Sequence, residues 1–311
     1  MTILVSAHNP MTGPRHLGHH VSTMKEWPRL QASHECFFVI DDLIATFMYP
    51  RDRAEIFDRS IFVAAEFMAS GINLKDANII LTSMVPEASE LLILLSNYIG
   101  SSLCRDLFDR SFLGMISVHD RDELELPLQP SLSEIIYPQL GLPALTLGLK
   151  ADLFQGGEEI SGYVTIMREI VRQFTGAHGE ILAAPTWEKP RTPFLPGLDG
   201  THMMSENAIY LSTPTEIKSM SESADYDAGA VRAIYEALRD PEEASELSVS
   251  KAADQLQDLI DRECERYRKS EIDSESVLDQ LALGAARAKF LLRSTLSEVK
   301  QALHIPEVLE Y

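Results

Sequence analysis

The sequence predicts an α/β fold in which a doubly wound parallel sheet is followed by an all-helical C-terminal region. Three observations lead to this prediction. Short apolar runs alternate with helical patterns in the first part of the chain. Polar residues directly follow the first two apolar runs, as they do at the carboxyl ends of parallel strands. From about residue 213 to the end, the pattern is helical.

The first three strands are expected at Ile3–Ala7, Cys36–Ile40 and Asn78–Thr82, because each is a short run dominated by apolar residues. Between the second and third strands, apolar residues at helical spacing predict a helix over residues 53–70, which Gly71 ends. This alternation is typical of parallel βαβ units.

Further helices are expected at Glu87–Tyr98, over residues 160–174 and, as the last strong helix, at Val277–Leu303. Residues 101–135 are charged and less regular, and we interpret them as an insertion. Proline and glycine crowd residues 185–200, which indicates a long ordered loop or a hinge.

Composition narrows the class of protein. The chain of 311 residues is 45% hydrophobic and 24% charged, which is ordinary for a soluble globular protein. No apolar stretch approaches the roughly 20 residues of a membrane span, and no basic region precedes the apolar start, so a signal peptide is not expected. The three cysteines lack metal-ligand spacing, and we expect free thiols in a reducing cytoplasm.

The charge balance bears on possible partners. There are 27 Lys and Arg residues against 47 Asp and Glu residues, a net charge of −20. Such a charge repels nucleic acid at long range, because polyanions bind clustered basic residues. It counts against a nucleic-acid partner, although a local basic face would still permit one.

The segment His16-Leu17-Gly18-His19 follows the first strand and opens a helical pattern. Glycine lets the backbone approach a phosphate closely, and a helix N-terminus offers free N–H groups. Two histidines would donate hydrogen bonds to a phosphoryl group as negative charge builds up. Alone, the motif also fits a histidine-rich turn, or a metal site with His20. The pair Asp41-Asp42 is interpreted as a cap of strand and helix in preference to a metal site.

The surrounding segments resemble the tryptophanyl branch of the class I aminoacyl-tRNA synthetases, in which this motif is the His-Ile-Gly-His signature. The resemblance covers nearly the whole chain, in the family's order. The matching segments are Asn9–Gly13, Cys36–Leu43, Ala69–Ile72, Thr82–Glu87, Tyr137–Pro138, Gly157–Glu159, Arg168–Ile170, Leu195–Gly200 and Gly284–Ala288. The resemblance implies a Rossmann-type fold and a homodimer that pairs through about residues 80–140.

It also implies a division into two domains. Residues 1–200 would form the Rossmann-type nucleotide-binding catalytic domain, with the insertion at about 101–135. Residues 201–311 would carry the second signature loop and the helical C-terminal domain.

In this family, an amino-acid carboxylate attacks the α-phosphate of ATP, pyrophosphate leaves, and the adenylate acylates a tRNA end. ATP is therefore implied, and Mg²⁺ follows from ATP chemistry alone, since no metal ligands stand out. Carried over by position, His16 and His19 would be catalytic, and Arg15 and His202 are added as candidate catalytic cations. The nucleotide would contact His8, Asn9, Thr12, Gly18, Gly157, Glu158, Glu159 and Met203. The amino acid would contact Val5, Ile44, Tyr137, Gly141, Ala144, Leu145 and Ile160.

The second signature departs from the family. It reads Lys-Met-Ser-Lys-Ser in relatives, whereas here the corresponding segment is Thr201–Asn207, and no lysine lies between Lys189 and Lys218. Losing a preorganised electrostatic group at a reacting phosphate costs on the order of 2.7–4 kcal/mol. His202, if protonated, and Arg15 are candidates to replace the lost cations.

The substrate pocket departs as well. The aspartate that reads the indole N–H in the tryptophanyl branch falls on Ala144 or Leu145, and a histidine behind it falls on Ile44. Ile160 stands where the family has a substrate-binding glutamine. An unpaired indole N–H would cost about 1–3 kcal/mol, so the sequence favours a smaller or wholly apolar side chain over tryptophan.

Three functions are compatible with these observations. The leading hypothesis is an enzyme that activates an amino acid as its adenylate and transfers it to a non-tRNA acceptor such as an amine. The alternatives are a divergent tryptophan–tRNA ligase that aminoacylates tRNA, and a non-catalytic relative that binds a nucleotide or an amino acid. The negative charge and acidic tail favour the first, whereas the lost lysines favour the third.

Overall fold

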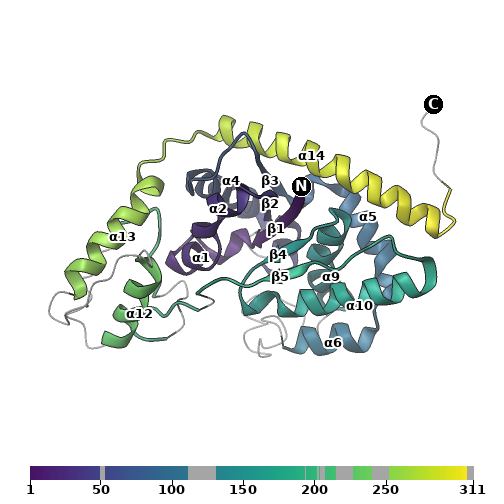
Figure 1. Cartoon of the computed structure of the whole chain (residues 1–311), viewed down its shortest axis with the longest axis horizontal. Helices are drawn as coiled ribbons and strands as arrows, with labels where there is room; N and C mark the ends of the chain where they lie inside the picture. The colour runs from purple at the N-terminus through teal and green to yellow at the C-terminus, as the bar shows by residue number, and fades with distance from the viewer. Residues whose placement is uncertain are drawn as a thin grey trace.

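A parallel sheet with helices on both faces forms the centre of the molecule (Figure 1). The computed structural model describes residues 1–49, 53–110, 131–192, 194–201, 203, 207–214, 227–239 and 252–306. In this part of the chain the sheet has five strands in the order β3-β2-β1-β4-β5. Their bounds are β1 Thr2–His8, β2 His34–Ile40, β3 Ala77–Leu81, β4 Leu153–Gln155 and β5 Thr186–Glu188.

All of these strand pairs are parallel. The chain moves outward from β1 to β3 on one side of the sheet and then returns to β4 on the other side of β1. The strand order therefore reverses between β1 and β4. In open α/β sheets, ligands bind at the carboxyl ends of the strands beside such a switch point.

The central residues of β1, β2 and β3 are mostly apolar because both faces of the sheet are covered. Side chains alternate between the faces along each strand. Leu4 and Phe38 belong to one hydrophobic cluster, while their neighbours Val5 and Phe37 belong to the other. All four side chains are fully buried.

The helices divide between these two clusters. On the side of Leu4 lie α1 (Leu17–Ser22), α2 (Trp27–Gln31), α4 (Arg53–Ala69), α12 (Ala228–Leu238) and α13 (Ala252–Arg268). On the side of Val5 lie α5 (Pro86–Leu95), α9 (Leu132–Gly148) and α10 (Ser161–His178). The remaining shorter helices are α3 (Asp42–Met48) and α6 (Ser101–Asp109), with 3-10 turns at Pro10–Thr12, Met24–Glu26, Thr82–Met84, Ser96–Tyr98 and Glu158–Ile160.

The last helix, α14 (Ser274–Ala302), packs along the β3 edge of the sheet and runs past α4 and α5 (Figure 1). Val277 lies in the first cluster and Leu292 in the second, so the helix closes both. A side chain at Gly284 would collide with the carbonyl oxygen of Ile79. Glycine at this position therefore lets the helix approach the strand backbone.

The structure confirms most of the predicted elements and corrects two interpretations. Within the expected irregular insertion, α6 is a regular helix that buries Cys104 and Phe108 against Ile135. Residues 111–130 of that segment lie outside the described residues. The Pro- and Gly-rich segment contains strand β5, which the sequence analysis missed, as it missed β4.

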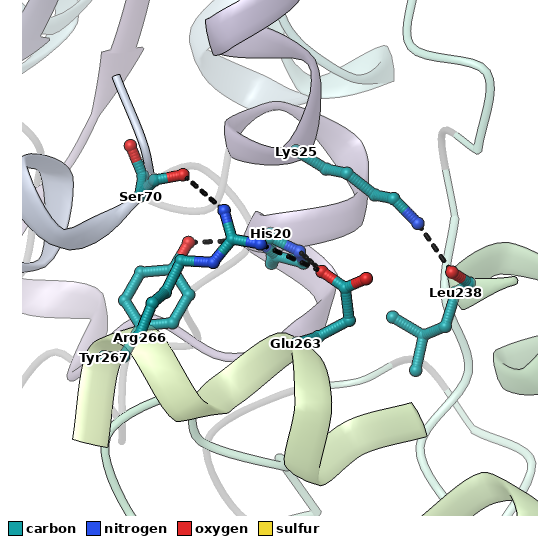
Figure 2. A network of polar contacts seen from close by, with 7 residues as sticks. All are labelled: His20, Lys25, Ser70, Leu238, Glu263, Arg266 and Tyr267. Atoms are coloured by element: carbon teal, nitrogen blue, oxygen red, sulfur yellow. Dashed lines mark hydrogen bonds and ion pairs between the residues drawn. The ribbon is translucent and has the colours of Figure 1, made fainter. Parts of the chain in front are cut away.

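The C-terminal helix α13 is joined to α1 by a buried polar network (Figure 2). His20 points at two α13 residues, with Nδ1 3.0 Å from the Tyr267 hydroxyl and Nε2 3.1 Å from a Glu263 carboxylate oxygen. Arg266 donates from Nη1 to the Ser70 carbonyl at 3.0 Å. Both ring nitrogens of His20 thus have protein partners.

The domain boundary at residue 200 stays a prediction. The first hydrophobic cluster contains residues from both sides of it, including Leu17 and Ile260. All three cysteines are free and buried, as expected of thiols without a metal or disulfide role. No helix in the described ranges combines the length and apolarity needed to cross a bilayer.

Candidate active site

The predicted site residues gather at the carboxyl ends of the strands, near the switch point. His8 is the last residue of β1, Asp41 follows β2, and Thr82 follows β3. Gly157 follows β4 on the other side of β1. Residues that are far apart in sequence therefore surround one region at this edge of the sheet.

The histidine motif forms the N-terminus of α1. His16 is the N-cap residue, and its Nδ1 accepts a hydrogen bond from the Gly18 N–H at 3.1 Å. The Nδ1 of His19 accepts one from the His16 N–H at 3.3 Å, which completes a reciprocal capping arrangement. Because a backbone N–H only donates, the neutral ring of His19 carries its proton on Nε2. The ring centroids of His16 and His19 are 3.9 Å apart.

Gly18 is required by this arrangement. A Cβ atom at this position would lie 2.8 Å from both Cε1 and Nδ1 of His16, because the histidine ring folds over the glycine backbone. The glycine therefore permits the cap in addition to leaving room for a ligand.

Burial lowers the pKa of two histidine rings in this region, those of His19 and His8. The pKa of His19 lies well below its usual value, mainly because the ring is buried and also because the Arg15 guanidinium is close. The same causes lower the pKa of His8. At neutral pH both rings are uncharged, so His19 donates as imidazole and not as imidazolium.

Arg15 is enclosed by the loop after β1, and its predicted contact with a phosphate stays a prediction. Its side chain is fully buried, and Nη2 donates to the carbonyls of Asn9 and Gly13 and to the Thr12 hydroxyl, at 3.1, 2.5 and 3.0 Å. Nη1 lies 3.2 Å from Nδ1 of His8. In this arrangement Arg15 shapes the loop after β1, and contact with a phosphate would need a rearrangement.

The other loop residues are fixed by their own hydrogen bonds. His8 uses Nε2 to contact the Thr23 hydroxyl at 2.9 Å, and Thr23 donates to the carbonyl of His19 at 2.9 Å. The side-chain oxygen of Asn9 accepts from the N–H of Met11 at 2.8 Å and caps the first 3-10 turn. The end of β1 is thereby connected to the helix that carries the histidines.

The predicted ribose-binding turn lies after β4. Glu159 accepts a hydrogen bond from the Gly157 N–H at 2.8 Å, so its carboxylate braces the turn. Glu158 is exposed and lies 3.3 Å from Nζ of Lys189, which sits 4.0 Å from the centroid of the Trp187 ring. Lys189 brings a cation to this turn. The sequence analysis missed it because it missed β5, which Lys189 follows.

The second-signature segment lies against the first. Met203 is 2% exposed and belongs to the first hydrophobic cluster, and its N–H donates to the carbonyl of Leu195 at 3.2 Å. Farther along, the Leu17 N–H donates to the carbonyl of Ile209 at 2.9 Å. His202 and residues 204–206 lie outside the described residues, so the predicted role of His202 stays a prediction.

A cavity of about 290 Å³ opens beside this region, and four predicted substrate residues line it: Ile44, Tyr137, Gly141 and Leu145. The other lining residues are Asp41, Leu43, Phe47, Thr82, Ala88, Ser89, Leu92 and Ile93. Of the two positions for the indole-reading residue, Leu145 therefore faces the cavity, and Ala144 is buried in the second cluster. Val5 and Ile160 also lie in that cluster and do not line this cavity.

Most of the cavity wall is apolar, but Asp41 and Thr82 lie in it as well. Thr82 places its hydroxyl 3.0 Å from Asp41 and 2.8 Å from Asp42. Asp41 also caps α3 through the Ile44 N–H at 3.5 Å, in agreement with the capping interpretation. The sequence analysis interpreted Asp41 as a cap and did not predict that it also lines the cavity.

The sequence matches the family of class I tRNA synthetases (W and Y) over residues 4–288. The chain belongs to this family. The match covers both signatures and most of the C-terminal helices, which confirms the resemblance seen in the motifs.

Individual relatives support the assignment. Tryptophan–tRNA ligase of Treponema pallidum is 30% identical over 215 residues, which cover 66% of this chain and 60% of that protein. The Chlamydia caviae enzyme is 33% identical over 208 residues, but only 58% of its length is covered. Tryptophan–tRNA ligase of Streptococcus pneumoniae is 27% identical, with 97% of each chain aligned.

Solved structures of this family share the fold. Tryptophanyl-tRNA synthetase from Mycoplasma pneumoniae superposes with a TM-score of 0.82 at 16% identity, covering 98% of each chain. The Campylobacter jejuni enzyme, solved with ADP and tryptophan, gives 0.78 at 19% identity and covers 97% of this chain and 100% of that one. The predicted Rossmann-type sheet with C-terminal helices is confirmed.

In the ranges that the structure describes, no group of three or more His, Cys, Asp or Glu side chains is placed to hold an ion, so the alternative of a metal site with His20 finds no ligand set there. Mg²⁺ in nucleotide sites is commonly held by one or two carboxylates together with substrate phosphates.

Proposed function

We propose that this synthetase-family chain activates an amino acid with a large apolar side chain as its aminoacyl adenylate, using ATP, and transfers it to tRNA. The observation that carries the proposal is the pair of histidines, His16 and His19, at the N-terminus of α1, next to a mostly apolar cavity. Adenylation needs donors for the reacting phosphate and a place for the amino acid, and this arrangement offers both.

The hydrogen-bond donors of the site would act on the phosphate, where negative charge develops during adenylation. The Nε2–H groups of His16 and His19 would donate to phosphoryl oxygens as the amino-acid carboxylate attacks and pyrophosphate leaves. The N-terminus of α1 adds backbone N–H groups. Because the pKa of His19 is depressed, its donor is already in place at neutral pH without a protonation step.

Cations for the departing pyrophosphate are few among the described residues of the cleft. Arg15 is enclosed by the loop, and Lys189 pairs with Glu158 at the ribose turn. We infer that Mg²⁺ bound to ATP supplies most of the positive charge that the family's second-signature lysines provide. Turnover should therefore depend steeply on free Mg²⁺.

The lining residues and the volume of the cavity indicate which substrate side chain it accepts. Ile44, Phe47 and Leu145 present apolar surface, and a volume of about 290 Å³ suits an aromatic or large aliphatic group. Burying such a group contributes roughly 1.5–3 kcal/mol. Leu145 offers no acceptor for an indole N–H, which supports a wholly apolar side chain over tryptophan.

The sequence and the comparisons favour different acceptors for the activated amino acid. Net charge and the acidic tail favoured a non-tRNA acceptor such as an amine. The relatives are named tryptophan–tRNA ligases, one of them along 97% of both chains, and this supports tRNA more strongly. We therefore prefer the tRNA ligase hypothesis to the amide-forming one.

The test is ATP–pyrophosphate exchange with the twenty standard amino acids, followed by charging of bulk bacterial tRNA with the best substrate. We expect exchange with an apolar amino acid, and acid-precipitable aminoacyl-tRNA. His19→Asn should abolish exchange, whereas His34→Gln, at the opposite end of the sheet, should not. Exchange with transfer to hydroxylamine but not to tRNA would favour the amine acceptor. Nucleotide binding without exchange would favour a non-catalytic protein.

A further inference from the structure

Two adjacent residues of α1 contact different parts of the molecule. The ring of His19 belongs to the candidate active site, where its centroid is 3.9 Å from that of His16 and 5.4 Å from that of His8. The ring of His20 contacts α13 instead (Figure 2). Because successive residues of an α-helix are about 100° apart around its axis, the direction of the His20 side chain also determines the direction of His19.

The contacts of His20 with α13 are directional. His20 is fully buried, and burial lowers its pKa. Although burial raises the pKa of Glu263, its hydrogen bond with His20 and the nearby cations hold that pKa below the usual value. A carboxylate only accepts hydrogen bonds, so Nε2 of His20 donates to Glu263 at 3.1 Å, and Nδ1 accepts from the Tyr267 hydroxyl at 3.0 Å. These two partners fix the ring on both sides.

The partners of His20 lie on a helix that is itself anchored elsewhere. Arg266 of α13 donates from Nη1 to the carbonyl of Ser70, directly after α4, and its Nη2 is 3.7 Å from Glu263. A Cβ atom at Gly71 would lie 2.8 Å from the same Nη1, so the guanidinium lies against this turn. Ile260 is fully buried in the first hydrophobic cluster. Helix α13 therefore gives His20 a fixed reference.

Helix α1 needs such a reference because it has only six residues. Isolated helices shorter than about 12–15 residues are marginal in water. Leu17 and Val21 pack in the first cluster, but apolar packing is non-directional. At its beginning, α1 is held by the hydrogen bond from the Leu17 N–H to the Ile209 carbonyl. His20 adds two side-chain hydrogen bonds farther along the helix, and these fix its rotation.

We propose that His20 is a positioning residue for adenylation: held by Glu263 and Tyr267, it sets the rotation of α1 and thereby the place of the His19 ring at the reacting phosphate. His20 and these α13 partners do not line the cavity, so they act through the position of α1. The inference rests on the proposed function for the reaction that His19 serves. The position of the His19 ring can be measured without that reaction.

Three variants of the full-length protein test the proposal. His20→Phe keeps a ring and removes both hydrogen bonds. Tyr267→Phe removes only the hydroxyl that Nδ1 contacts, so it tests the same link with less disturbance of the core. His20→Gln is the conservative variant, because its amide N–H can still donate to Glu263.

The matched control is His178→Phe. His178 also uses a ring nitrogen to contact a tyrosine hydroxyl, with Nε2 2.6 Å from Tyr98. It is the last residue of α10, whose first turn follows the predicted ribose-binding turn. At about 1.5 Å per residue, the length of α10 separates His178 from the site. Thermal unfolding of each variant gives a temperature at which all of them are folded.

ATP–pyrophosphate exchange is measured with the best amino-acid substrate at varied concentration. Loss of an interaction that is made only in the transition state lowers kcat and leaves KM nearly unchanged. The kcat of His20→Phe should therefore fall about 10- to 100-fold, and that of Tyr267→Phe should fall by less. His20→Gln should stay within about threefold of the wild type, and His178→Phe should keep the wild-type kcat. An unchanged kcat in His20→Phe, a change in KM alone, or an equal fall in His178→Phe would overturn the inference.

Nitrogen-15 NMR of the histidine rings reports on His19 without the reaction. In the wild type, Nδ1 of His19 accepts from the His16 N–H, so the ring should show the tautomer with its proton on Nε2. In His20→Phe that hydrogen bond should be lost and the His19 signals should shift, whereas in His178→Phe they should stay. The spectrum of His19→Asn assigns these signals.

Unchanged His19 signals in His20→Phe would overturn the inference even where exchange is reduced. Absence of exchange in the wild type, together with His19 signals that shift in His20→Phe, would refute the proposed function and leave the positioning role of His20 standing.

Discussion

Replacing Gly18 by alanine would test the histidine cap most sharply. The new methyl carbon would lie 2.8 Å from Cε1 and Nδ1 of His16, whereas ordinary contacts begin at 3.4 Å. The ring would have to move by at least about 0.6 Å, and its hydrogen bond with the Gly18 N–H would be lost. Loss of a cap costs about 0.5–2 kcal/mol, and a displaced catalytic group lowers the rate by as much as about 100-fold.

The matched control is Gly176→Ala. Gly176 lies inside helix α10, where a Cβ atom would meet nothing within 4 Å. Alanine there should stabilise the protein by about 0.4–1 kcal/mol, because it restricts the unfolded chain. Urea unfolding should thus show opposite signs for the two variants, and pyrophosphate exchange should fall only in Gly18→Ala. Exchange within twofold of wild type in Gly18→Ala would refute the role assigned to the cap.

Three further predictions concern other parts of the molecule. His20→Ala removes the His20 partner of the Tyr267 hydroxyl and leaves Glu263 with Arg266 at 3.7 Å, so urea unfolding should show a loss of about 1–3 kcal/mol; a loss under 0.5 kcal/mol would contradict the network's role. Because the pKa of Asp41 is raised from 3.8 to about 7, the folded state holds its proton more tightly than the unfolded state. Wild-type stability relative to Asp41→Asn should therefore fall as pH rises from about 4 to about 7, and a rise would contradict the assignment. Ile93 is 63% exposed on α5, in the region expected to pair two chains; Ile93→Glu should convert a dimer into a monomer in sedimentation velocity, and a monomeric wild type would disprove the dimer.

The main sheet could be predicted because β1, β2 and β3 are buried on both faces and therefore read as apolar runs. β4 and β5 have three residues each, which is too short for an alternation or a run to be distinctive. Helix α6 was hidden by its charged surface, since it buries little more than Cys104 and Phe108. Its pattern was mistaken for an irregular insertion.

For the site, sequence patterns identified the residues but not their partners. The position of His16 and His19 before a helix predicted a phosphate-binding turn only together with the resemblance of the surrounding segments to the synthetase family. The enclosure of Arg15 by backbone carbonyls was not predictable, because it depends on how the following loop folds. Asp41 was interpreted only as a cap, because its place in the cavity wall depends on how residues distant in the chain, such as Tyr137 and Leu145, come to line the same cavity.

The central claim is that this chain forms an aminoacyl adenylate with an apolar amino acid, and ATP–pyrophosphate exchange measures that step directly. The full-length protein should exchange label at saturating Mg²⁺ with at least one apolar amino acid, and not with aspartate, lysine or serine at the same concentration. A preference for tryptophan over every other side chain would contradict the assignment of the cavity. Absence of exchange with all twenty, in a protein that unfolds cooperatively, would contradict the claim itself.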